Sequence, residues 1–183
     1  MPHVHVPLDW HRIEWMPGDT WTQDIVPRLA KVGINQTQLR RCVYVIRLHG
    51  DFCIGYPKGE SPTIYIGEGR FGQRIRQHSK WVTRIKDLVG AFSFQVCIAF
   101  PRVTGNPTAY REVEATLLEY FGKKYGTTPL WNKQYETRKC LHYAYSEQSI
   151  KEALNKRSGA KYLWAIRPMR SSPFHRFFEQ PPR

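Results

Sequence analysis

The chain has 183 residues, of which 41% are hydrophobic and 14% aromatic, so it can bury a core and is not a disordered chain. Its 28 Lys and Arg residues against 15 Asp and Glu residues give a formal net charge of +13. No apolar run approaches the ~20 residues of a membrane span, and the first residues lack the basic and apolar regions of a secretory leader. The four cysteines form no Cys-x-x-Cys pair, which favours reduced thiols over a disulfide framework or a zinc cluster. We therefore expect a cytoplasmic protein.

The positive charge is unevenly distributed along the chain. Residues 1–40 are neutral overall, residues 41–133 carry a net charge of +7, and residues 134–183 carry +6. Clustered Arg and Lys are typical of proteins that bind polyanions, of which nucleic acid is the commonest. We interpret residues 1–40 as an N-terminal extension, 41–133 as the core, and 134–183 as a basic C-terminal extension.

In the N-terminal extension, Thr20–Lys31 fits a short helix, which Pro27 forces to start late or to kink. In the core, β-branched and aromatic residues predict strands, of which the first two pair antiparallel, and helical spacing of apolar residues predicts helices. The predicted order is strand 42–48, strand 63–67, helix 71–88, strand 91–100 and helix 108–125. The fold class is therefore α+β, with a small antiparallel three-stranded sheet flanked by helices.

The C-terminal extension contains a segment that resembles a helix capping box, Ser149–Glu152, from which we expect a helix to about Arg157. A strand over residues 161–166 and a Pro- and Arg-rich tail over 167–183 complete the prediction.

Glu114 is unusual among the carboxylates of the predicted helix 108–125. At about 100° per residue it falls inside the apolar stripe of this helix, whereas Glu112 and Glu119 fall on the opposite, solvated face. A carboxylate on an inward face is costly unless it is paired or binds a metal ion. The sequence leaves open a structural Arg partner or a metal site.

Arg74 and His78 lie four residues apart on the predicted helix 71–88 and therefore share a face. An Arg fork fits a phosphate in two-point contact, and a neighbouring His can move a proton near neutral pH. The alternative is a basic helix that simply faces solvent. For the strand residues Tyr44 and Tyr65, taken alone, packing in the core is the ordinary interpretation.

Taken together, these residues make the segment 42–133 resemble the GIY-YIG nuclease domain. Cys42-Val43-Tyr44 stands where the family has Gly-Ile-Tyr, and Tyr65-Ile66-Gly67 reproduces Tyr-Ile-Gly. The other matching positions are Arg74, His78, Glu114 on a helix that resembles the family's metal-binding helix, and Asn132. Two features depart from the pattern: Cys42 replaces a glycine, and the connection from Tyr44 to Tyr65 is long. We expect this connection to be an insertion that contacts nucleic acid.

The resemblance implies a DNA endonuclease that hydrolyses phosphodiester bonds with one divalent metal ion, Mg²⁺ or Mn²⁺. It implies that Glu114 binds the metal ion and that Arg74 stabilises charge developing on the phosphate. Tyr65 and Asn132 would position the phosphate and the catalytic groups. Either Tyr44 or His78 would accept the proton of the attacking water.

The layout is similar to small restriction endonucleases of the family. It favours a restriction, defence or phage-related nuclease that acts as a homodimer on a palindromic site. The alternative is a catalytically silent nucleic-acid-binding module on the same fold. In either case the expected partner is DNA and not a membrane. The basic residues expected to contact DNA are Arg70, Arg76, Lys80, Arg84, Lys133, Arg167 and Arg170.

Overall fold

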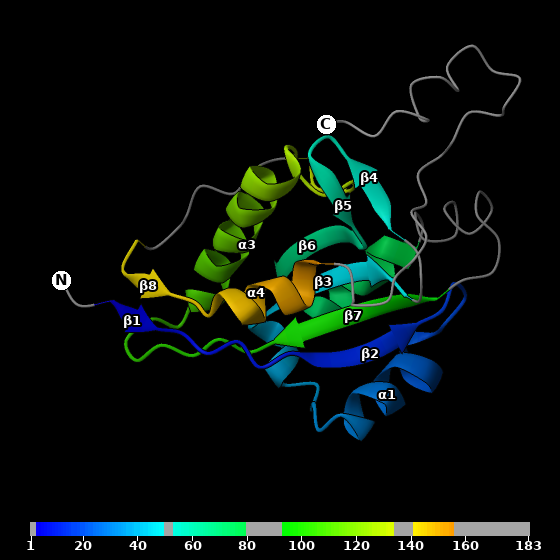
Figure 1. The fold of residues 1–183 in the computed structure, drawn as a ribbon. Coiled ribbons are helices and arrows are strands. Elements are labelled where there is room, and N and C mark those ends of the chain that lie inside the picture. The colour runs from blue at the N-terminus through cyan, green and yellow to red at the C-terminus, as the bar shows by residue number, and fades with distance from the viewer. Residues whose placement is uncertain (1–2, 50–52, 80–92, 134–140, 156–183) are drawn as a thin grey trace, which may run out of the picture.

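The computed structural model describes residues 3–49, 53–79, 93–133 and 141–155. Within these ranges the predicted α+β class is confirmed, with an antiparallel sheet that has helices on both sides (Figure 1). None of the helices in the described ranges has the length and apolar character needed to cross a membrane. The strands are β1 Val4–His5, β2 His11–Trp15, β3 Cys42–Leu48, β4 Ile54–Tyr56, β5 Gly59–Ser61, β6 Thr63–Gly69, β7 Phe94–Ala99 and β8 Tyr143–Ala144. The helices are α1 Val26–Lys31, residues 71–79, α3 Ala109–Tyr125 and α4 Glu147–Leu154.

The main sheet has the strand order β2-β7-β3-β6, which makes β3 a central strand and β6 an edge strand. All seven residues of β3 are buried, as expected for a β-branched and aromatic strand covered on both faces. The antiparallel pairing of β3 with β6 is confirmed, and it places Tyr44 opposite Gly67. The sheet has one strand more than the three expected, because β2 comes from the N-terminal extension. Only Ile13 and Trp15 of β2 are buried, which makes β2 a weakly apolar edge strand.

The helices follow the predicted pattern with one shift. Residues 71–79 are helical, and the rest of the predicted helix lies outside the described residues. Helix α3 ends at Gly126, whose φ of 81° favours glycine as a C-terminal cap. Helix α1 follows a π-helical turn and carries Pro27 in its first turn, where the missing N–H costs no hydrogen bond. The N-cap of helix α4 is Ser146, three residues before the predicted cap Ser149, and its side chain accepts a hydrogen bond from the Ser149 N–H.

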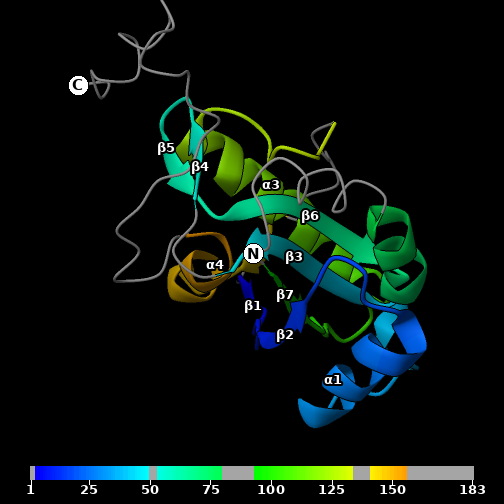
Figure 2. The same cartoon turned by 90° about the vertical axis from the view of Figure 1, so that its right-hand side faces the viewer.

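Two apolar layers lie on the two faces of the sheet, and both predicted extensions contribute to them. One layer packs Tyr44 and Phe71 with residues of the N-terminal segment such as Trp15 and Leu29. The other packs the sheet against α3 and against α4, which contributes Leu154 (Figures 1 and 2). The flanks therefore share a core with residues 41–133. The predicted strand 161–166 and the tail lie outside the described residues.

The long connection between β3 and β6 contains the β4–β5 hairpin, which packs on the C-terminal end of α3. The Tyr56 ring contacts that of Phe121 edge-on with 4.9 Å between centroids, and the Lys58 N–H donates to the Tyr125 carbonyl at 3.1 Å. The described part of this insertion therefore supports the helix that carries Glu114.

Candidate active site

Tyr44 and His78 form a buried pair on one face of the sheet. The Tyr44 hydroxyl and His78 Nε2 are 3.1 Å apart in a hydrogen bond. Tyr44 is 0% exposed and His78 is 7% exposed. Residues 71–79 pack on the strand through Phe71 and Ile75, and this contact brings the next helical turn, with His78, over the Tyr44 ring. The structure therefore brings two of the predicted site residues into direct contact.

Tyr65 completes the cluster from the neighbouring strand β6. Its ring lies 4.5 Å from that of His78 and 6.0 Å from that of Tyr44, measured between centroids. Unlike the other two residues, Tyr65 is only partly buried, so it is the member of the trio that faces solvent.

Gly67 makes room for both tyrosines. A Cβ atom at this position would lie 2.5 Å from Tyr65 Cε1 and 2.7 Å from the Tyr44 hydroxyl. Real Cβ atoms do not make contacts this short, so no side chain fits without moving the rings. The packing of the two tyrosine rings thus explains why the Tyr-Ile-Gly motif needs a glycine at position 67.

Cys42, which replaces the first glycine of the resemblance, also fits without strain. It is a buried strand residue opposite Gly69, and its thiol donates to the Gly69 carbonyl at 3.3 Å. Burial raises the pKa of the Cys42 thiol to about 12, so it stays protonated. Cys53 and Cys97 are likewise buried and form no disulfide with a described residue, while Cys140 lies outside the described residues.

Burial is the main cause of the shifted pKa values in the tyrosine–histidine trio. Removal from water raises the pKa of Tyr44 well above its ordinary value of 10.0, and it also raises the pKa of Tyr65. Burial first, and the charge of Arg74 second, lower the pKa of His78 from 6.5 to about 4. His78 is therefore a neutral imidazole at neutral pH and is able to accept a proton.

Two opposite charges act on this trio from different elements. Arg74, exposed on the helix of residues 71–79, lowers the pKa of both tyrosines, whereas the charge of Glu114 on α3 raises both. Helix α3 packs against β6, the edge strand that carries Tyr65, and it therefore holds Glu114 close to the tyrosines. The charges of Arg74 and Glu114 therefore both act on the two tyrosines, and Arg74 also acts on His78.

The three carboxylates of α3 differ in their surroundings. Glu114 is half-buried beside the fully buried Val113 and Leu117. Glu119 forms an ion pair with Lys123, with 2.5 Å between Oε1 and Nζ. Glu112 accepts a hydrogen bond from the Asn106 amide at 2.6 Å. Glu112 and Glu119 are half-buried like Glu114, although the helical spacing placed them on the solvated face. Glu114 is therefore the carboxylate of this helix that acts on the tyrosines.

Asn132 makes a two-point contact with the backbone of β6. Its Oδ1 accepts from the Ile66 N–H at 2.9 Å, and its Nδ2 donates to the Ile66 carbonyl at 2.8 Å. The preceding residue, Trp131, donates its N–H to the Ile64 carbonyl at 3.0 Å. Asn132 thus fixes the outer edge of the strand that carries Tyr65 and Gly67, which makes it a positioning residue.

The donor set at this site fits a hard divalent cation held by few protein ligands. Among the described residues, no group of three or more His, Cys, Asp and Glu side chains comes close enough to form a closed metal site. Mg²⁺ is commonly bound through one or two carboxylates, with waters and substrate phosphate oxygens as the other ligands. The half-buried Glu114 can supply one such carboxylate, and the tyrosine hydroxyls beside it are neutral oxygen atoms.

A basic hollow of about 500 Å³ adjoins Arg74. Its charged lining residues are Arg40, Arg41, Glu68, Arg70, Arg74 and Arg111. Arg70 and Arg74 were predicted from the sequence, whereas Arg40, Arg41 and Arg111 were not. The register could have revealed Arg41, because Cys42 pairs with Gly69 and so places Arg41 near Arg70.

The residues predicted to contact DNA are only partly within the described ranges. Arg70, Arg76 and Lys133 are exposed, and the Arg76 guanidinium lies over the Trp21 ring at 6.0 Å from its centroid. Lys80, Arg84, Arg167 and Arg170 lie outside the described residues.

Comparison of the chain with family models, with curated proteins and with solved structures found no match. The functional interpretation therefore depends on the residues and the geometry of this site.

Proposed function

We propose that this protein is a divalent-metal-dependent DNA endonuclease that hydrolyses phosphodiester bonds. The observation that carries the proposal is the buried hydrogen bond between the Tyr44 hydroxyl and the neutral His78, with the charges of Arg74 and Glu114 both acting on it. A neutral proton acceptor, a free guanidinium and a half-buried carboxylate are the groups that phosphodiester hydrolysis needs. The resemblance of segment 42–133 to the GIY-YIG nuclease domain supports the same function.

In this proposal, Arg74 binds the scissile phosphate and stabilises the charge that develops on it. The pKa of Tyr44 is too high for the phenol to ionise alone near neutral pH. Its hydroxyl therefore passes a proton to His78 Nε2 while it accepts one from the side of Tyr65, where solvent reaches the trio. Tyr44 and His78 then act as a relay, in which both residues are needed for proton removal from the attacking water.

Glu114 would hold the metal ion in this proposal. When bound, a divalent cation supplies positive charge to the phosphate oxygens. Asn132 acts indirectly, because it fixes the backbone of the strand that carries Tyr65. A role in restriction or defence, with a homodimer on a palindromic site, belongs to the same proposal, and the resemblance to small restriction endonucleases supports it.

The proposal is tested by cleavage of plasmid and of single-stranded DNA with Mg²⁺, with Mn²⁺ and with a chelator. Wild type is compared with Glu114→Ala, Tyr44→Phe and His78→Gln, and Glu119→Ala is a matched control on the same helix. We expect metal-dependent cleavage that is lost in the first three variants and kept in the control. If Glu114→Ala cleaves like the wild type, the metal assignment is wrong.

The alternative is a nucleic-acid-binding module on the same fold that does not cleave. The basic hollow beside Arg74 would suit this function equally well. Absence of cleavage under both metals, with salt-sensitive DNA binding retained, would favour this module over the nuclease.

A further inference from the structure

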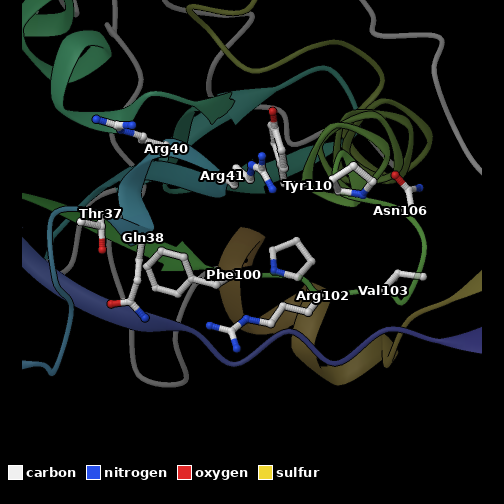
Figure 3. Close-up of a pocket in the computed structure, with 11 residues that line it drawn as sticks. Thr37, Gln38, Arg40, Arg41, Phe100, Arg102, Val103, Asn106 and Tyr110 are labelled. Atoms are coloured by element: carbon white, nitrogen blue, oxygen red, sulfur yellow. The ribbon is translucent and has the colours of Figure 1, made fainter.

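Three neighbouring hollows on the surface form a continuous arginine-lined track. The first is the hollow of about 500 Å³ beside Arg74. It shares Arg40, Arg41 and Tyr110 with a second hollow of about 530 Å³, which Phe100 and Arg102 also line (Figure 3). A third hollow of about 410 Å³ shares Arg40, lies beside Trp21 and contains Arg76. The track therefore reaches well beyond the candidate active site, onto the segment before β3 and the loop after β7.

Three of the arginines on this track differ from the arginines elsewhere in the described structure, whereas Arg76 Nε donates to the Gly72 carbonyl at 2.9 Å and Arg111 lies beside Glu68. Away from the track, Arg12 pairs with Glu152, Arg28 pairs with Asp19, and the buried Arg47 donates to carbonyls at the end of α4. These side chains are used to hold the fold together.

On the track, Arg40, Arg41 and Arg102 are all exposed. Among the described residues, none of the three side chains has a hydrogen-bond or ion-pair partner. Figure 3 shows Arg41 above and Arg102 below the Phe100 ring, with Arg40 directed away from this hollow. Among the described residues that line the three hollows, Glu68 is the single acidic one, and its Oε2 lies 4.0 Å from Arg111 Nε. These three guanidinium groups are therefore available to an external anion.

We propose that Arg40, Arg41 and Arg102 bind backbone phosphates of the DNA strand as it leaves the candidate active site. The proposal rests on the proposed function for the identity of the polyanion. Guanidinium forks match phosphate oxygens in two-point contacts, and phosphates recur at regular intervals along a nucleic acid. One strand can therefore engage more than one hollow at once, whereas a small phosphate compound would fill only one. Contacts of this kind orient the DNA without reading its sequence.

The test is the salt dependence of DNA binding, measured by fluorescence anisotropy with a labelled duplex of mixed sequence. A chelator is present throughout, so that binding is measured without cleavage. The variant is Arg40→Gln/Arg41→Gln/Arg102→Gln. The control, Lys31→Gln/Lys123→Gln/Lys151→Gln, removes the same charge from exposed residues that line none of the three hollows. Circular dichroism establishes that both variants are folded.

Each lost phosphate contact reduces the slope of log K against log salt by about 1. We therefore expect the slope of the triple arginine variant to be smaller than that of the wild type by about 3, and the slope of the single variant Arg102→Gln to be smaller by about 1. The slope of the lysine control should decrease by less than about 1. An arginine variant that keeps the wild-type slope and affinity overturns the track, and so does a wild type without salt-sensitive binding. The nuclease proposal is judged separately by the Glu114→Ala cleavage assay. If the arginine variant loses salt-dependent binding but the wild type does not cleave DNA, the track is confirmed and the protein is the nucleic-acid-binding module.

Discussion

Gly67→Ala is a sharp test of how the site is packed. The added methyl group would lie 2.5 Å from Tyr65 Cε1 and 2.7 Å from both Cζ and the hydroxyl of Tyr44. Ordinary contacts need more than about 3.4 Å, so the rings must move by close to 1 Å. Overpacking a buried site of this kind costs about 1–3 kcal/mol of unfolding free energy. That is a fraction of the ~5–15 kcal/mol typical of a domain, so the variant should still fold.

The expected effect of Gly67→Ala on activity is larger than its effect on stability. A displacement of about 1 Å in a catalytic group can cost on the order of 100-fold in rate. We expect urea unfolding to show the modest loss of stability and plasmid cleavage to fall about 100-fold.

The control for this variant is Gly72→Ala. Its Cβ would lie 2.8 Å from Cη2 of Trp21, which is partly exposed and can shift. Gly72 lies in the helix of residues 71–79, and in a helix alanine is favoured over glycine by up to about 1 kcal/mol. The control should therefore keep wild-type cleavage. Wild-type stability and cleavage in Gly67→Ala would refute the packing described for the two tyrosines.

Three further variants test separate parts of the structure. His78→Gln should flatten the pH dependence of stability. In the wild type, the pKa of His78 is lowered from 6.5 to about 4, so between these pH values the unfolded chain binds a proton that the folded protein does not. The wild-type free energy of unfolding therefore falls by about 3 kcal/mol through this group as the pH drops from 6.5 to about 4. If the urea midpoints of wild type and His78→Gln shift equally with pH, the assigned burial is wrong. Asn132→Asp keeps the acceptor for the Ile66 N–H but sets a carboxylate oxygen against the Ile66 carbonyl, and should lose about 1–3 kcal/mol in urea unfolding together with cleavage. Arg47→Met should lose about 3 kcal/mol by the same measurement, because it removes the charged donor to the carbonyls at the end of α4; an unchanged midpoint would show that α4 is held by its apolar face alone.

The sequence predicted the parts of the fold that local pattern determines. β3 has the predicted bounds, and α3 agrees to within one residue, because a β-branched run and an apolar stripe closed by Gly126 are strong local features. Strand β2 was missed since its burial depends on pairing with β7, distant in sequence, more than on its own composition. The start of α4 was placed three residues late because Ser146 and Ser149 offer similar caps, and only packing of the apolar face selects the first.

The site was predicted as a set of residues, but their individual environments depend on tertiary structure. Helical spacing placed Arg74 and His78 on one face, and the structure adds that Arg74 is exposed while His78 is buried. Asn132 was expected to position the phosphate and the catalytic groups, and the structure adds that both polar atoms of its amide contact Ile66. No periodicity reveals a contact between residues 66 positions apart. The register of β3 with β6 places Arg41 near Arg70, and the sequence predicted that these strands pair but not their register.

The depth of each group in the site has a chemical consequence. A histidine with a pKa near 4 is a weak base, but its low basicity keeps it unprotonated at the pH where most enzymes act. His78 is only 7% exposed, so little of its ring contacts bulk water, and the hydrogen bond at Nε2 goes to the fully buried Tyr44 hydroxyl. Phosphate binding, in contrast, requires contact with the surface, where Arg74 lies. In the proposed function, one helical turn separates the proton acceptor His78 from the phosphate-binding Arg74, so the same short helix provides both groups. A variant that exposes His78 without removing it would raise its pKa and protonate it at mildly acidic pH, and the acid limb of a cleavage profile should then move toward neutral pH.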